Sequence, residues 1–294
     1  MDLSLCNGGA QRSIQRRANA PAAPAAPTER GSTPMPRVRY GPRTPEELDG
    51  ARAARARIPD IWSTSVIAVW ETDPDAVAQV LPPPLKPAAR PLVRATISSV
   101  DLPGGHLLGA GSVAVRAVHD GLEGDYPLVM PMTTERALIG GREVFGEPKK
   151  LGDVVVRRDG DHISAGLTRH GISFVLVSGA VTGELPPPPD HENLDFYFKF
   201  LPAPDGDGLD SDAALVHCTR RGRTRSLHRI EGTVVLNESP FDPVADLPVR
   251  ELVEITLGER TSVQEGRIVE RVPAETLLPY VHQRYDDPMQ ALDS

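Results

Sequence analysis

Short runs of β-branched or alternating residues, separated by glycine, proline and aspartate, follow one another through most of this 294-residue chain. Runs of this kind are typical of β-strands, and the residues between them are typical of turns. The predicted strands cover residues 65–70, 91–100, 112–118, 153–158, 162–168, 173–181, 194–200, 213–219 and 226–236. Because few helical segments interrupt them, the pattern predicts a β-rich α+β fold built on an antiparallel sheet.

Four segments have the composition of helices, namely residues 45–58, 73–81, 133–145 and 274–285. Asp73 is placed to cap the second of them, and Gly146 is placed to end the third. The sequence Asp159-Gly160-Asp161 predicts a hairpin turn between two of the strands. Most of the remaining chain is therefore expected to be strand or turn.

Residues 1–44 differ from the rest of the chain because Ala, Pro, Arg, Ser and Gly dominate them. Such a segment buries too little apolar surface to offset the entropy lost on ordering, so we expect a disordered tail there. Residues 45–294 are then expected to form a single domain. The apolar fraction of 39% over the whole chain is sufficient for a sizeable core.

The overall charge and the cysteine count exclude several classes of protein. A net charge of −8, with no basic stripe, argues against a nucleic acid or an anionic membrane as partner and favours a small organic substrate. Cys6 and Cys218 are too few for a disulfide framework, and no apolar run approaches the ~20 residues of a membrane-spanning helix. We therefore expect a cytoplasmic protein. The histidines lack metal-ligand spacing, so we expect neither a metal nor a cofactor.

The chain contains only four lysines, and two of them, Lys149 and Lys150, are adjacent. Arginine supplies positive charge equally well but cannot condense with a carbonyl group, so a retained lysine pair indicates nucleophilic amine chemistry. The plainer interpretation is a solvated surface pair. Gly146 and Pro148 predict a tight turn before Lys149, which then begins a strand. Successive strand residues face opposite sides, so Lys150 need not share a pocket with Lys149.

The segment around the two lysines resembles the Schiff-base segment of the acetoacetate decarboxylase superfamily. Residues 141–152 contain Gly-Arg-Glu, then four residues, then Pro-Lys-Lys-Leu-Gly. Gly124-Asp125-Tyr126 and residues 72–85 and 246–253 are similar to further stretches of that family, so the likeness extends over about residues 61–285. It implies a curved antiparallel sheet closed into a cone-like β-barrel with peripheral helices. It also implies assembly into a homo-oligomer.

The resemblance implies that Lys149 attacks the ketone carbonyl of an oxo acid and that the resulting iminium acts as an electron sink. Lys150 would modulate Lys149. A lysine nucleophile must be neutral, whereas its ordinary pKa is about 10.4. From the strand geometry we expect desolvation to lower that pKa more than the charge of Lys150 does.

Three charged residues that surround the imine in the decarboxylases are absent from this chain. By resemblance, the family arginine falls on Ser63, and its two glutamates fall near Thr96 and Ala110. The electron sink is kept, while groups that orient the substrate and move protons are lost. The chain is therefore similar to divergent superfamily members that carry out aldolase-dehydratase or cyclising dehydration chemistry.

Replacement acid–base groups are sought among nearby titratable residues, namely Glu147, His106, His119 and Tyr126. Each also has a plainer interpretation: Tyr126 as a packed core residue, Glu147 and His119 as surface or turn residues, and His106 as a loop residue. Arg142 and Glu143 belong to the shared motif and are expected to pair locally at the end of their helix.

The favoured hypothesis is a cofactor-independent lyase that forms a Schiff base with a small oxo acid and decarboxylates a 3-oxo acid. The alternative is an aldolase-dehydratase or cyclising dehydratase acting on a 2-oxo acid in specialised metabolism. A second alternative is a catalytically silent binding protein with the same fold. Retention of both lysines argues against that last possibility.

Overall fold

The computed structural model of the protein describes residues 38–56 and 60–286, which belong to two units divided between residues 58 and 59. In the first unit, helix α1 (Pro45–Ala56) begins with a capping box. The backbone amide of Thr44 donates to Glu47 Oε2, and the amide of Glu47 donates to Thr44 Oγ1. The helix predicted over residues 45–58 is confirmed up to Ala56. Residues 1–37 and 57–59 lie outside the described part, so the disordered tail stays a prediction.

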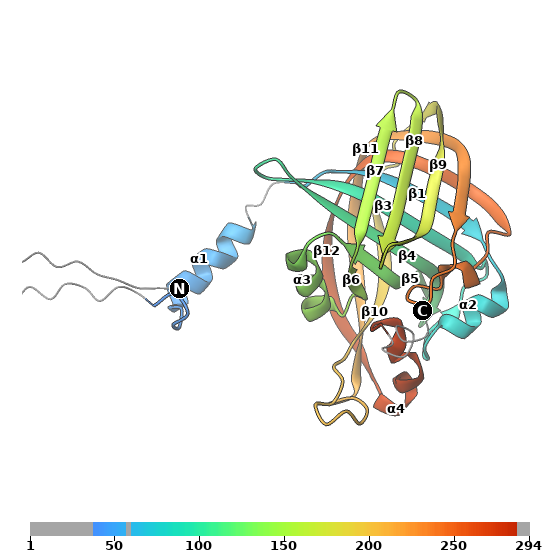
Figure 1. Cartoon of the computed structure of the whole chain (residues 1–294). Helices are drawn as coiled ribbons and strands as arrows, with labels where there is room; N and C mark the ends of the chain where they lie inside the picture. Colours follow the sequence, from blue (N-terminus) through green and yellow to red (C-terminus); the bar gives the residue numbers. More distant parts are fainter. Residues whose placement is uncertain (1–37, 57–59, 287–294) are drawn as a thin grey trace, which may run out of the picture. The chain divides into compact units, whose positions relative to one another are not determined.

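The second unit contains a twelve-stranded sheet within residues 60–286 (Figure 1). Its strands are β1 (Ser63–Glu71), β2 (Lys86–Pro87), β3 (Leu92–Leu102), β4 (His106–His119), β5 (Leu122–Met132), β6 (Lys149–Leu151), β7 (Asp153–Asp159), β8 (His162–Arg169), β9 (Ile172–Leu185), β10 (His191–Lys199), β11 (Ala213–Leu236) and β12 (Glu251–Val272). The main path of hydrogen-bonded neighbours runs β10-β5-β4-β3-β1-β12-β11-β9-β8-β7. Strand β10 also pairs with β11, so the hydrogen-bonded pairings that run from β10 through β5, β4, β3, β1, β12 and β11 lead back to β10.

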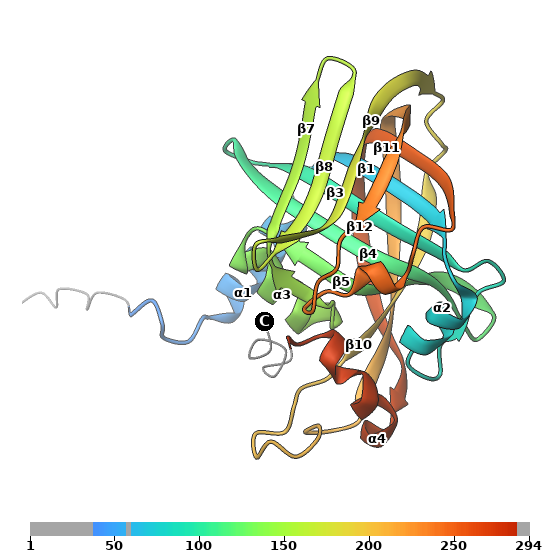
Figure 2. The same cartoon turned by 45° about the vertical axis from the view of Figure 1, so that its right-hand side comes forward.

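The β-rich fold predicted from the sequence is confirmed. The sheet is mixed rather than wholly antiparallel, because β5 pairs in parallel with both β10 and β6. Strands β7, β8 and β9 form a hairpin-linked group beside strands β3 and β4 (Figure 2). The cone-like shape of a closed barrel stays a prediction.

Every predicted strand overlaps a strand of the structure, but two long strands were not predicted. Strand β5 contains Gly124, Pro127 and Pro131, which weaken the local strand signal. Strand β12 is 22 residues long, and just over half of its residues are exposed, with charged and apolar side chains mixed along it. Its backbone is held by ladders to β1 and β11, which a local sequence pattern does not reveal.

Five helical elements, two of them 3-10 turns, accompany the sheet within residues 60–286. Helix α2 (Pro74–Val80) is capped by Asp73, as predicted. The predicted helix over residues 274–285 is shorter, with α4 (Ala274–Leu277) followed by the 3-10 turn η2 (Leu278–Gln283). A second 3-10 turn is η1 (Val244–Asp246). No helix within residues 38–56 and 60–286 is long and apolar enough to cross a membrane.

Helix α3 (Glu135–Phe145) and the turn after it place the lysine pair. Thr134 caps its start, and Gly146 ends it in the left-handed region with φ of 83°. Pro148 follows, and β6 then begins at Lys149, in register with Met130 of β5. The predicted order of helix, glycine stop, turn and strand is confirmed.

Gly146 and Gly140 provide a matched test of this turn. A Cβ on Gly146 would lie 2.6 Å from Lys199 Cα, and its φ is unfavourable for other residues, so Gly146→Ala should lower the free energy of unfolding by at least about 1 kcal/mol. A Cβ on Gly140, in the same helix, meets nothing within 4 Å. Gly140→Ala should therefore raise that free energy by up to about 1 kcal/mol. Urea unfolding of both variants checks this, and equal shifts would contradict it.

Candidate active site

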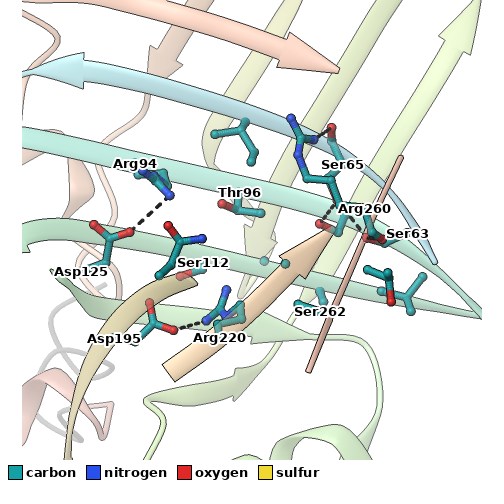
Figure 3. Close-up of a pocket in the computed structure, with 18 of the residues that line it drawn as sticks. Ser63, Ser65, Arg94, Thr96, Ser112, Asp125, Asp195, Arg220, Arg260 and Ser262 are labelled. Carbon is teal, nitrogen blue, oxygen red and sulfur yellow. Dashed lines mark hydrogen bonds and ion pairs between the residues drawn. The ribbon is translucent and has the colours of Figure 1, made fainter. Parts of the chain in front are cut away.

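A cavity of about 490 Å³ is lined by residues of β1, β3, β4, β5, β10, β11 and β12, the seven strands whose pairings return to their start. Every second residue of a strand faces the same side, so Ser63 and Ser65 of β1 face it together with Thr96 of β3 (Figure 3). The charged groups in its wall are Arg94, Asp125, Asp195, Arg220, Arg223 and Arg260, with His191 as a titratable neighbour. The cavity is therefore polar and richer in cations than in anions.

Lys149 and Glu147 form a close pair beside this cavity. Lys149 Nζ lies 2.7 Å from Glu147 Oε2, and the two side chains are 14% and 1% exposed. Gln264 of β12 donates to the other carboxylate oxygen, Glu147 Oε1, at 3.1 Å. Within the described residues, Oε2 accepts no hydrogen bond of good angle, so its contact with the amine is electrostatic. Glu147 lies in the turn between α3 and β6, as expected, but the expectation of a surface position is wrong, because its charge is buried against a partner.

Gly141 and Arg142 explain part of the shared sequence motif. A Cβ on Gly141 would lie 2.6 Å from Lys149 Nζ, so glycine leaves the space that the pair occupies. Arg142 Nη1 donates to the backbone oxygen of Lys149 at 3.0 Å and thereby holds the start of β6. Its other partners in the described chain are Arg284 and the ring of Tyr285. The expected local pairing of Arg142 with Glu143 is therefore not observed.

Lys149 is not one of the residues that line the cavity, but it adjoins the wall. Met130, its register partner on β5, lines the cavity. So does Arg220, whose register partner on β12 is Gln264, the residue that hydrogen-bonds Glu147. The Lys149–Glu147 pair thus lies next to the end of the cavity formed by Met130 and Arg220.

Asp195 provides a buried acid–base group at that same end. It forms an ion pair with Arg220 and accepts a hydrogen bond from the hydroxyl of Tyr197 at 3.2 Å. Its register partner on β5 is Asp125. Burial raises the pKa of Asp195, and the charge of Asp125 adds to that rise against the opposing pull of Arg220. Asp195 is therefore easier to protonate than an ordinary aspartate.

These two aspartates are absent from the candidates predicted from the sequence. Asp125 belongs to the Gly-Asp-Tyr motif, of which only Tyr126 is among the acid–base candidates that the sequence suggests. Asp195 is the single acid within the apolar run of β10, and a charge in such a run is a signal for a functional site. Neither signal by itself shows that the two residues meet.

The acetoacetate decarboxylase (ADC) family model matches residues 41–272. This chain belongs to the acetoacetate decarboxylase family. Acetoacetate decarboxylases from Burkholderia multivorans and Burkholderia vietnamiensis are each 30% identical to it. Each alignment covers 64% of this chain and 78% of the relative.

Solved structures of the acetoacetate decarboxylase family resemble the fold. One acetoacetate decarboxylase structure superposes with a TM-score of 0.65 at 21% identity, covering 73% of this chain and 91% of the other. The enzyme from Legionella pneumophila gives 0.64 at 19% identity, covering 72% and 88%. MppR, an enduracididine biosynthesis enzyme in complex with the condensation product of pyruvate and imidazole 4-carboxaldehyde, gives 0.63 at 18%, covering 71% and 89%. At these identities the likeness establishes the fold.

The three positions at which the resemblance implied a loss of charge all face the cavity. Ser63, Thr96 and Ala110 line it, from β1, β3 and β4. The wall at these positions is therefore uncharged in this member of the acetoacetate decarboxylase family, while other positions supply arginine and aspartate.

Lys150 has partners different from those of Lys149, as strand alternation predicts. Its amine lies 3.0 Å from Asp286 Oδ1 and 3.5 Å from Asp242 Oδ1. Arg169 pairs with the same two carboxylates, at 2.6 and 2.7 Å. This network links β6 and β8 to the segments that contain Asp242 and Asp286. Modulation of Lys149 by Lys150 stays a prediction.

The remaining candidates, His119, Tyr126 and His106, do not line the cavity. Tyr126 is a packed core residue, as expected, and its hydroxyl donates to Gln283 Oε1 at 2.7 Å. Burial raises its pKa above the usual value.

The expectation that His119 lies at the surface is wrong, because its side chain is 3% exposed. Its two ring nitrogens contact His217 at 2.9 Å and Glu270 at 3.1 Å, which satisfies them on burial. His106 is exposed beside the turn that precedes β4. No group of three or more His, Cys, Asp or Glu side chains within residues 38–56 and 60–286 is placed to hold a metal ion.

The network around Lys150 predicts a specific loss of stability in acid. Burial opposes ionisation of Asp286, but hydrogen bonds from Arg169 and the charge of Lys150 lower its pKa well below the usual value. A carboxyl group with a lowered folded pKa stabilises the fold above its unfolded pKa of about 3.9, and this contribution is lost as the pH falls further.

We expect Asp286→Asn to lower the free energy of unfolding by about 2 kcal/mol at pH 7, less than for a fully buried pair because Asp286 is partly exposed. The difference from the wild type should shrink as the pH falls below about 4. Urea unfolding at a series of pH values measures it. Asp153→Asn, at an exposed position on β7, is the control. A difference that stays constant with pH would contradict the prediction.

Proposed function

We propose that this protein is a cofactor-independent lyase that forms a Schiff base between Lys149 and an oxo acid. The observation that carries the proposal is the Lys149 amine held 2.7 Å from the buried carboxylate of Glu147, next to a polar cavity rich in arginine. A surface lysine pair would have neither the burial nor the dedicated partner. Membership of the acetoacetate decarboxylase family supports the same chemistry.

Glu147 is placed to remove the proton that blocks the nucleophile. In the first step, a proton moves from Lys149 Nζ to Glu147 Oε2, which has no other aligned donor in the described chain. The free amine then attacks the ketone carbon, and the C=O π pair moves to the oxygen. Protonation of that oxygen and loss of water leave an iminium on Lys149. Gln264 keeps the other oxygen of Glu147 in place.

Decarboxylation of a 3-oxo acid is the favoured outcome of that iminium. The bond between the α-carbon and the carboxylate breaks, and its electron pair forms a double bond between the α-carbon and the iminium carbon. The π pair of the C=N⁺ bond moves to the nitrogen, and carbon dioxide leaves. The enamine then takes a proton at carbon, and hydrolysis releases the ketone and the free amine of Lys149. The Burkholderia relatives named acetoacetate decarboxylase support this outcome.

Aldolase-dehydratase or cyclising dehydratase chemistry on a 2-oxo acid is the second candidate. It requires a base that removes an α-proton and an acid that protonates a leaving hydroxyl group. Asp195, whose pKa is raised by burial, has an environment suited to both roles. The uncharged residues Ser63, Thr96 and Ala110 favour this candidate, because they differ from the charged set of the decarboxylases. The similar fold of MppR, which was solved with a condensation product of pyruvate, supports it.

Trapping with borohydride distinguishes these outcomes. We expect the intact mass of the wild type to rise after reduction in the presence of acetoacetate or pyruvate, and Lys149→Ala to lose the adduct while staying folded. Lys199→Ala, which removes an exposed amine, is the control and should keep it.

An acetoacetate adduct that has lost its carboxylate identifies a decarboxylase, whereas adducts that keep it favour aldolase-dehydratase chemistry. Absence of any Lys149-dependent adduct would favour a silent binding protein. Assembly into a homo-oligomer, supported by the family resemblance, and a cytoplasmic location, supported by the low cysteine count, are part of the same proposal.

The role of Glu147 has its own test. We expect Glu147→Gln to slow imine formation by about 100-fold, since an amide cannot accept the proton from Lys149. Glu147→Asp, which keeps a carboxylate, should recover part of that rate. Single-turnover trapping with borohydride measures both. Gln264→Leu removes only the hydrogen bond to Oε1 and should have a smaller effect than Glu147→Gln. Equal rates in the wild type and Glu147→Gln would remove Glu147 from the mechanism.

A further inference from the structure

Arg260 differs from the other arginines of the cavity wall because it has no carboxylate partner within the described residues. Arg94 pairs with Asp125, Arg220 pairs with Asp195, and Arg223 pairs with Asp60. The hydrogen bonds of Arg260 are to neutral groups, from Nη1 to the backbone oxygen of Ser65 at 3.0 Å and from Nη2 to Thr256 Oγ1 at 3.1 Å. A guanidinium has five N–H donors, so three remain available.

Hydroxyl groups surround Arg260 on both neighbouring strands. Its register partners are Ser63 on β1 and Thr224 on β11, and both line the cavity. The hydroxyl of Ser63 lies 3.0 Å from that of Ser65, which in turn lies 2.8 Å from that of Ser98. Figure 3 shows Arg260 beside Ser63 and Ser65. One free cation among hydroxyl donors is an arrangement that suits a carboxylate group.

The electrostatics of Arg260 favour an anion as its missing partner. Burial lowers its pKa to about 10, against the opposing charge of Glu254, and the charge of Arg94 adds a smaller effect in the same direction as burial. Arg260 therefore stays charged at neutral pH although its surroundings disfavour the charge. An anionic group in the cavity would relieve that cost.

Arg260 lies far from the amine of Lys149. On β12 it is four residues from Gln264, a separation of about 13 Å along a strand, and Gln264 contacts Glu147 beside Lys149. The guanidinium of Arg260 lies close to Gly258, which is farther still from Gln264. Acetoacetate has three carbon–carbon bonds and spans about 3.6 Å, the length of one extended residue. It cannot contact both groups.

We propose that Arg260 binds the remote carboxylate of an extended oxo acid whose ketone reacts at Lys149. The proposal rests on the proposed function and narrows its substrate class, from small oxo acids to longer ones whose acid group lies far enough from the ketone to reach Arg260. Arg260 lies on β12, directly across from Ser63 of β1, and both residues line the cavity. Its guanidinium therefore supplies a positive charge to this part of the wall, where Ser63 supplies none.

A series of methyl-ketone acids of increasing length tests this with the full chain. We use 4-oxopentanoate, 6-oxoheptanoate, 8-oxononanoate and 10-oxoundecanoate and measure dissociation constants by calorimetry, followed by borohydride trapping. Affinity should rise at least tenfold from the shortest to the longest acid, and Arg260→Gln should abolish the rise. The control is Arg221→Gln, which removes an exposed arginine of β11 paired with Glu192 and Glu265. It should keep the rise.

Two further measurements distinguish a failure of the Arg260 site from a failure of the Schiff-base function. The methyl ester of 10-oxoundecanoate should bind the wild type at least tenfold more weakly than the acid, which tests the carboxylate even if Arg260→Gln does not fold. Lys149→Ala should keep the length-dependent affinity while losing the trapped adduct. Affinity independent of length, or unchanged in a folded Arg260→Gln variant, would overturn the proposal. Length-dependent binding without any trapped adduct would overturn the Schiff-base function and leave the Arg260 site standing.

Discussion

The buried carboxylate of Glu147 is the constraint on which the rest of the site depends. A charge that is 1% exposed is tolerated only where a partner and further hydrogen bonds replace water. Lys149 supplies the charge, Gln264 supplies one hydrogen bond, and Gly141 supplies the space. The three come from β6, β12 and α3, so the pair forms only after distant segments have assembled. The Lys149 amine is therefore fixed in position before any substrate arrives.

Strand alternation connects this pair to the cavity. Along β12, Arg260, Ser262 and Gln264 share one face, because every second side chain points to the same side. This face of β12 therefore presents Arg260, which has no carboxylate partner in the described chain, at one point along the strand, and Gln264, which contacts Glu147, four residues farther on. Such a surface sorts substrates by length as well as by charge, whereas a single arginine beside the amine would sort them by charge alone.

Features that depend on near neighbours in the chain could be predicted from the sequence. Asp73 caps its helix through an amide two residues away, and Gly146 ends α3 through the carbonyl groups of Gly141 and Arg142. Features that depend on distant pairing could not. Arg260 meets Ser63 across a ladder that joins residues 197 positions apart, and nothing local to either residue indicates it. The burial of Glu147 could not be predicted for the same reason, since it depends on Gln264 of a strand that was not predicted.

The two adjacent lysines show most clearly what cannot be predicted from the sequence. One dipeptide supplies two buried amines, and its sequence does not show which of them faces the cavity wall. Alternation along β6 separates them: Lys149 contacts a single carboxylate beside the cavity, whereas Lys150 joins a network of two carboxylates and Arg169. A single carboxylate can take up one proton and release the amine for reaction. Two carboxylates shared with an arginine instead tie the amine of Lys150 into a network of ion pairs, so the presence of both lysines reflects one demand from the proposed chemistry and one from the fold.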